Sequence, residues 1–125
     1  MKLSSLNSLL VNELSPTEFS TEISEELIEH TQGLEKISGV ASVRVTEDLD
    51  ILITRKNLNI LCNLFITDSL TSSELAYVAD AMQMSDRVEF SDSGISDIVS
   101  EFTDPIINGV FTKERALIIM GNHVA

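Results

Sequence analysis

The sequence predicts an α+β fold: a mainly helical single domain (residues 1–125) with a small antiparallel β-hairpin packed on the helices. Apolar residues recur at offsets of three and four along most of the chain, which is the period of an amphipathic helix. Between Val43 and Ile53 the period falls to two, which is typical of strands. The length of 125 residues suits one hydrophobic core, and no linker-like stretch divides the chain.

Two helices are predicted in the N-terminal third. The first is short and lies within residues 4–12, where three leucines share helical offsets: Leu6, Leu9 and Leu10. The second has a sharper start, because Ser15 can cap it, Pro16 suits its first position, and Glu18 can reach back to the cap. Its expected end is Gly33.

The predicted hairpin lies in the middle of the chain. Its strand positions alternate with polar residues and are Val43, Val45, Ile51 and Ile53. Glu47, Asp48 and Asp50 belong to the exposed acidic connection between the two strands. Because an isolated hairpin is marginally stable in water, we expect it to lie against the helices.

Residues 55–66 fit two interpretations. The apolar side chains Leu58, Leu61, Cys62 and Phe65 match helical offsets, but the same stretch alternates well enough for a buried strand. We favour the helix, with Thr54 as its cap; the strand would instead extend the sheet to a third member. Cys62 lies on the apolar side of this helix, which predicts a buried structural thiol and not a nucleophile.

A further helix is predicted to begin at residues 72–74 and to be central, because apolar side chains surround it. It should end at Ser85 and Asp86. Residues 88–90 then cross in an extended form before the next helix starts.

The last two helices are amphipathic. The first of them has an apolar stripe made of Ile95, Ile98, Val99 and Phe102, and it should finish near Thr103 because Pro105 disfavours helical geometry at Asp104. Asn108 and Gly109 supply a turn. Thr112 can cap the final helix, whose expected core-facing residues are Ala116, Leu117 and Met120.

Charge narrows the classes of partner. Eight Lys and Arg against twenty Asp and Glu give a formal net charge of -12 at pH 7, which repels nucleic acid and anionic membranes. The same charge favours association with a basic protein surface. A single cysteine excludes an internal disulfide, and neither a signal-peptide core nor roughly 18 uninterrupted apolar residues are present, so we expect a cytoplasmic protein.

Residues that could carry chemistry are sparse. His30 lies on an apolar stripe, which predicts a packed histidine, and His123 lies among the last residues. Two histidines and one cysteine at these spacings do not form a zinc site, and no glycine-rich phosphate loop is present. We therefore predict no catalytic residue, no cofactor, no metal ion and no enzymatic activity.

The stretch from residue 74 to residue 112 contains ELAYVADAM, then VEF, then TDPIINGVFT. It resembles small acidic bacterial immunity proteins of contact-dependent or polymorphic toxin systems. The matching residues are Tyr77, Asp80, Asp104, Pro105, Asn108, Gly109 and Thr112. The resemblance implies a cytoplasmic protein that binds one cognate toxin domain tightly and blocks it. We expect the protein to be a monomer or weak dimer.

Exposed acids are the candidate contact groups for such a partner, which we expect to be basic. They fall on the first long helix, in the hairpin connection and on the amphipathic helix near residue 100: Glu22, Glu25, Glu29, Glu47, Asp48, Asp50, Asp97 and Glu101.

Three alternatives remain open. A small acidic secretion chaperone would have similar size and charge, but would present apolar patches and dimerise. A non-catalytic relative of chemotaxis-type phosphatases would explain Glu101 followed by Asp104, although an asparagine is missing from that pair. A nucleic-acid mimic fits on charge alone.

Overall fold

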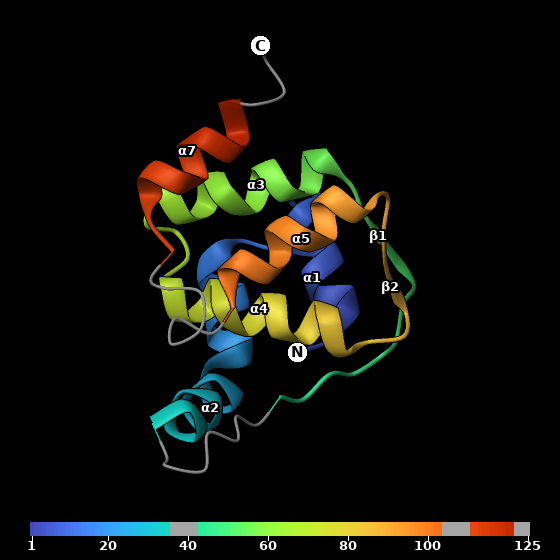
Figure 1. Cartoon of the computed structure of the whole chain (residues 1–125). Coiled ribbons are helices and arrows are strands. Elements are labelled where there is room, and N and C mark those ends of the chain that lie inside the picture. The colour runs from blue at the N-terminus through green and yellow to red at the C-terminus, as the bar shows by residue number, and fades with distance from the viewer. Residues whose placement is uncertain (36–42, 104–110, 122–125) are drawn as a thin grey trace.

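The computed structural model describes residues 1–35, 43–103 and 111–121 (Figure 1). Its elements in chain order are α1 (Leu3–Leu10), α2 (Pro16–Glu35), β1 (Ile51–Ile53), α3 (Arg55–Ile66), α4 (Ser72–Met84), β2 (Val88–Phe90), α5 (Ser93–Phe102) and α7 (Lys113–Gly121). The prediction of a mainly helical chain is confirmed. Among the described helices, none combines the length and the hydrophobicity that crossing a bilayer requires.

The two strands are parallel, so the predicted antiparallel hairpin is wrong. β1 pairs with β2, and Ile51, Leu52 and Ile53 lie opposite Val88, Glu89 and Phe90 in that order. Parallel strands need a long crossover connection, which α3 and α4 supply here.

Residues 43–45 do not pair with β1 because the segment that follows them joins the N-terminus of the chain instead. Thr46 forms an isolated parallel bridge with Lys2. The amide of Leu3 donates to the carbonyl of Thr46 at 3.1 Å, and the amide of Thr46 donates to the carbonyl of Met1 at 2.8 Å. The strand-like segment that ends at Thr46 therefore pairs with the N-terminal residues and not with β1.

The starts of α2, α3, α5 and α7 follow the sequence closely, because each depends on a capping side chain within one turn. The Glu18 amide donates to the Ser15 hydroxyl at 3.1 Å at the start of α2. Thr54 and Asn57 form a reciprocal capping box, which confirms that residues 55–66 are a helix. Asp92 caps α5 and Thr112 caps α7, each by accepting from the amide three residues later.

One of two predicted helix ends turns out differently. α2 continues past Gly33 to Glu35, since one glycine costs a helix only about 1 kcal/mol and does not stop it. α5 ends at Phe102, close to the predicted stop at Thr103. The predicted stop at Asp104 and Pro105, the predicted turn at Asn108 and Gly109, and His123 lie outside the described residues.

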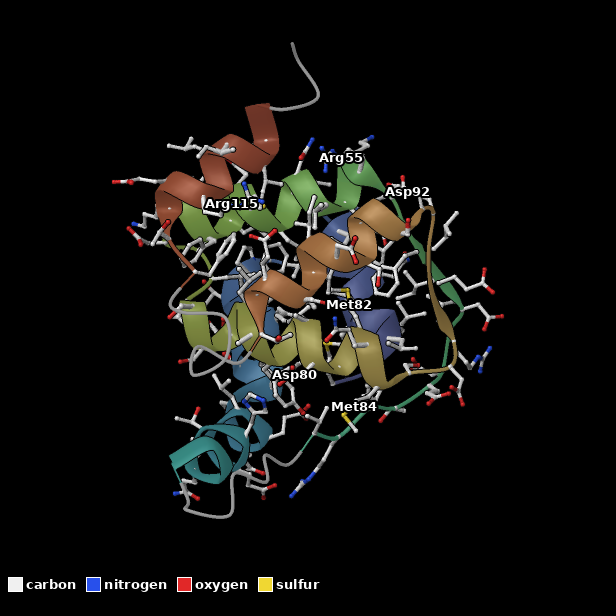
Figure 2. All side chains as sticks on the ribbon, viewed as in Figure 1. Arg55, Asp80, Met82, Met84, Asp92 and Arg115 are labelled. Atoms are coloured by element: carbon white, nitrogen blue, oxygen red, sulfur yellow. The ribbon has the colours of Figure 1, made fainter. Side chains whose placement is uncertain are left out.

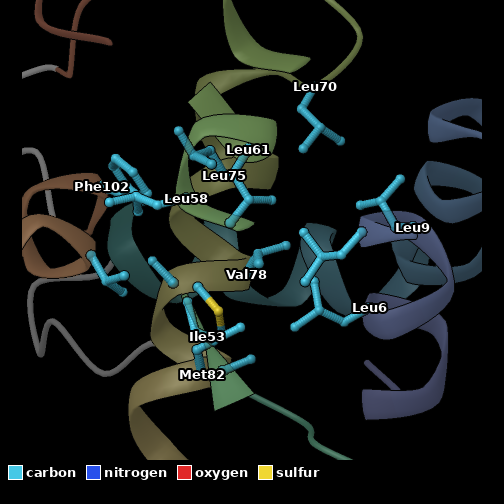
Figure 3. Packing of buried hydrophobic residues seen from close by; sticks show 14 of the residues in the cluster. Leu6, Leu9, Ile53, Leu58, Leu61, Leu70, Leu75, Val78, Met82 and Phe102 are labelled. Atoms are coloured by element: carbon cyan, nitrogen blue, oxygen red, sulfur yellow. The ribbon is translucent and has the colours of Figure 1, made fainter. Parts of the chain in front are cut away.

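The core is built around α4, which confirms its predicted central place (Figure 3). Leu75, Val78 and Met82 of this helix are buried. They pack with Leu58 and Leu61 of α3, Leu6 and Leu9 of α1, and Ile53 of β1 within one cluster.

α7 lies along α3 (Figure 1). It buries Ala116 and Ile119, whereas Leu117 is 56% exposed, so the predicted core face of this helix is partly wrong. Met120 is half-buried. The reason is that α3 covers only one narrow stripe of α7, and Ala116 and Ile119 form that stripe.

Candidate protein-interaction surface

The acidic stripe of α2 is partly used within the molecule. Glu29 pairs with the guanidinium of Arg44. Glu22 is exposed and accepts a hydrogen bond from the Ser5 hydroxyl at 3.0 Å. Glu25 is exposed and has no partner among the described residues. Of the three predicted contact residues on this helix, Glu25 is thus the one without a partner among the described residues.

Asp48, a predicted contact residue, serves α1. Its carboxylate accepts from the backbone amide of Ser4 at 2.9 Å and from the Ser4 hydroxyl at 2.6 Å. The residue before α1 is Lys2, whose side chain makes no capping bond, so Asp48 supplies the acceptor that the helix start lacks. The Ser4 hydroxyl and amide hold the pKa of the Asp48 carboxyl below its usual value.

Arg87 connects the acidic segment 47–50 to the start of β2. Its Nε donates to Asp50 Oδ1 at 2.6 Å, and its Nη1 donates to the carbonyl of Glu47 at 2.7 Å. The hydrogen bond from Arg87 lowers the pKa of Asp50, and the same bond raises the pKa of Arg87. Because the Asp50 side chain is 79% exposed, we treat this pair as a positional link with little effect on stability.

A groove lies beside the two strands. It has a volume of about 420 Å³ and is lined by Asp50, Ile51, Leu52, Asp86, Arg87 and Glu89. Leu52 and Glu89 are opposite each other in the strand register. In Figure 2, which has the same view as Figure 1, side chains with oxygen and nitrogen ends project outward beside β1 and β2, at the right.

The groove gathers residues that the sequence prediction missed. Asp50 was predicted, whereas Leu52, Asp86, Arg87 and Glu89 were not. The signal that could have revealed them is the short VEF segment: paired with ILI, it places Glu89 across from Leu52. Without that pairing, residues 86–89 read only as a helix end followed by a crossing.

The predicted contact residues of α5 behave differently from each other. Asp97 is exposed and has no partner among the described residues. Glu101 accepts two hydrogen bonds from Arg115 of α7, at 2.8 and 2.9 Å, and this contact raises the pKa of Arg115. Glu101 therefore joins α5 to α7. Glu47, Asp48 and Asp50 thus lie on one segment, and Glu22 of α2 lies near it, because Glu22 and Asp48 bond the adjacent residues Ser5 and Ser4 of α1. Asp97 and Glu101 belong to a separate helix, α5.

A buried polar cluster joins α2 to α4. The Tyr77 hydroxyl donates to Glu26 Oε1 at 2.6 Å and accepts from the Arg44 amide at 3.1 Å. Burial and Glu26 together raise the pKa of Tyr77. His30 Nε2 lies 2.7 Å from Asp80 Oδ2, and its ring meets the Tyr77 ring edge-on at 5.0 Å. His30 is 1% exposed, which confirms the packed histidine and makes the cluster structural.

Cys62 is buried, as predicted for a structural thiol. Desolvation raises its pKa to about 11, so the thiol stays protonated at neutral pH and is a poor nucleophile. Within the described ranges, no group of three or more His, Cys, Asp or Glu residues is arranged to hold a metal ion.

Comparison with protein-family models, with curated proteins and with solved structures finds no match for this chain.

Proposed function

We propose that this protein is an immunity protein of the cytoplasm, which binds a cognate bacterial toxin domain and neutralises it by covering a basic surface with acidic side chains. The observation that carries the proposal is uncompensated negative charge at the surface. Several exposed acids have no partner among the described residues, namely Glu13, Glu25, Asp86, Glu89, Asp97 and Glu114.

The basic side chains do not offset these acids, because more than half of those that the structure describes already pair with other acids. Ion pairs within the chain occupy four of the seven described Lys and Arg: Arg44 with Glu29, Arg87 with Asp50, Lys113 with Asp68, and Arg115 with Glu101. What remains at the surface is strongly negative. Such a surface speeds encounter with a basic partner and disfavours nucleic acid.

Toxin domains that act on nucleic acid need a basic surface to hold it, which gives an acidic inhibitor a complementary target. The resemblance carried by residues 74–112 points to the same class of protein. Its described residues act within the fold: Tyr77 and Asp80 belong to the buried polar cluster, and Thr112 caps α7. The toxin contacts are accordingly sought among other side chains.

Co-expression with a toxin encoded immediately upstream tests the proposal. We expect cells to survive and the two proteins to purify as one complex, whereas cells that express the toxin with an empty vector die. A Thr67→Ala variant provides a matched control, because it removes an exposed hydroxyl and leaves every exposed acid in place. Normal killing together with the absence of a complex contradicts the proposal.

A secretion chaperone is the second candidate function, and one observation favours it. Leu117 and Ile118 are adjacent on α7 and are 56% and 53% exposed. A chaperone uses such apolar surface to hold a secreted protein and to dimerise. A sedimentation measurement separates the two functions, because the proposed immunity protein sediments as a monomer or weak dimer and a chaperone as a stable dimer.

No observation favours a relationship to chemotaxis-type phosphatases. Arg115 holds both carboxylate oxygens of Glu101. Asp104, the second residue of that comparison, lies outside the described residues.

A further inference from the structure

We propose that the groove beside β1 and β2 is the face that receives the partner, and that its occupant is a protein segment that places a lysine or arginine between Asp86 and Glu89 and an apolar side chain against Leu52. This inference rests on the proposed function, since it names the surface through which the inhibitor acts.

The shape comes from the strand pair. Side chains alternate between the two faces of a strand, so Ile51 and Ile53 point into the core and Leu52 points out. Leu52 is 53% exposed, next to a groove of about 420 Å³. An apolar side chain that is half exposed on a strand can lose further solvent contact when a partner covers it, which favours binding.

The charge of the groove selects the chemistry of the occupant. Asp50, Asp86 and Glu89 line it, with Arg87 as the single cation among its lining residues. Arg87 already donates to Asp50 and to the carbonyl of Glu47. Asp86 and Glu89 have no partner in the described parts of the chain, so a cation entering the groove meets carboxylates that are not yet neutralised. Contact with a partner removes water and strengthens this attraction.

The other acidic surfaces are less suited to a cation. A second groove, of about 300 Å³, is lined by Arg55 and by Asp92, and Asp92 already caps α5 (Figure 2). A third, of about 180 Å³, contains Glu22 and Glu26, of which Glu26 accepts the Tyr77 hydroxyl. Among the described grooves, the one beside the strands therefore combines unpaired carboxylates with an exposed apolar side chain.

The first experiment maps the surface with a defined probe. The probe is the peptide acetyl-Lys-Leu-Arg-Leu-Lys-amide, titrated into the full chain while backbone amide shifts are followed by NMR. We expect the largest shifts at residues 50–52 and 86–89. A control peptide with glutamate in place of each basic residue should leave these amides unmoved. Shifts that are largest on α2 or α5, or spread evenly over all acidic surfaces, overturn the inference.

Charge-matched variants then test the groove directly. The double variant Asp86→Lys and Glu89→Lys should bind the basic peptide on the order of tenfold more weakly, because two attractions become repulsions. The control Glu25→Lys and Asp97→Lys makes the same change in net charge at exposed acids outside the groove lining. It should weaken binding clearly less than the groove variant, because it changes the summed field and no contact in the groove. Equal losses in the two variants overturn the inference. If the groove variant does not fold, Asp86→Asn with Glu89→Gln replaces it.

The same variants in the co-expression assay separate this inference from the proposed function. Protection by the control variant and loss of protection by the groove variant support both. Protection by both variants overturns the groove as the contact face and leaves the proposed function standing. If the native chain gives no protection while the basic peptide still maps to the groove, the immunity function is wrong and the surface assignment stands.

Discussion

Asp48 and Asp86 are both exposed acids, but their side chains have different roles. Asp48 completes the hydrogen bonding of a helix start, and Asp86 has no partner among the described residues. The residue type and its exposure are the same in the two cases. What separates them is a contact with Ser4, which lies 44 residues away in sequence, and no local pattern reports such a contact.

Neutralising Asp48 should destabilise the protein in a pH-dependent way. The folded pKa of Asp48 is lowered, so its contribution to stability is present above the unfolded pKa of about 3.9 and is lost as the pH falls through the folded value. Asp48→Asn should therefore lower the unfolding temperature at about pH 7, with a difference that shrinks as the pH falls from about 5 toward 2. Thermal unfolding across this range checks the expectation. Asp97→Asn, which removes no described contact, is the control, and a constant difference across the range contradicts the mechanism.

Tyr77 is a second residue whose polar atom can be tested alone. Tyr77→Phe keeps the buried ring but leaves Glu26 and the Arg44 amide without the hydroxyl. An unsatisfied buried polar group costs about 1–3 kcal/mol, so the free energy of unfolding should fall by about that amount. Urea unfolding measures it. Thr67→Ala is the matched control: it removes an exposed hydroxyl that donates to the Asn63 carbonyl and should change stability by less than about 0.5 kcal/mol. Equal effects in the two variants rule out a special role for the cluster.

At the scale of elements, the sequence predicted helices well and the sheet badly. The starts of α2 and α3 were predictable because each cap bonds to an amide within the same turn. The β1–β2 pairing joins residues that are separated by two helices, so alternation in one segment could not identify its partner. Short strands add to the difficulty, since Val88–Phe90 has only three residues in which to show a period.

The strand register makes a prediction about two adjacent residues of β1. Ile53 is fully buried, so Ile53→Ala should lower the free energy of unfolding by about 2–5 kcal/mol through lost apolar contact and a cavity. Leu52 points outward, and Leu52→Ala should change it by less than about 0.5 kcal/mol. Urea unfolding of both variants measures the contrast. Similar losses at the two positions would mean that the strand does not present these faces.

At the scale of the whole molecule, composition predicted the sign of the surface but not its layout. The charge of -12 indicated a basic partner, and the predicted contact acids were chosen because acids are usually exposed. The fold then occupies Glu29, Asp48, Asp50 and Glu101 with contacts inside the chain. It also gathers Asp86 and Glu89 beside Leu52, which the sequence prediction missed because it lacked the β1–β2 pairing.

The excess charge also predicts how a complex should form. If the uncompensated acids steer a basic partner, the association rate constant should exceed that of a neutral encounter by roughly 10- to 1000-fold at low salt and should fall steeply as salt screens the field. The dissociation rate constant should change much less, since the contacts at the interface are close and partly shielded from solvent. Stopped-flow mixing with the partner recovered by co-expression, from about 10 mM to about 500 mM salt, measures both constants.

A matched variant, Glu13→Gln with Glu114→Gln, removes two exposed acids outside the groove. It should lower the association rate constant and leave the dissociation rate constant unchanged, because steering depends on the summed field and not on one contact. An association rate constant that does not respond to salt would show that the acidic surface does not attract the partner. The negative charge would then serve solubility and not binding.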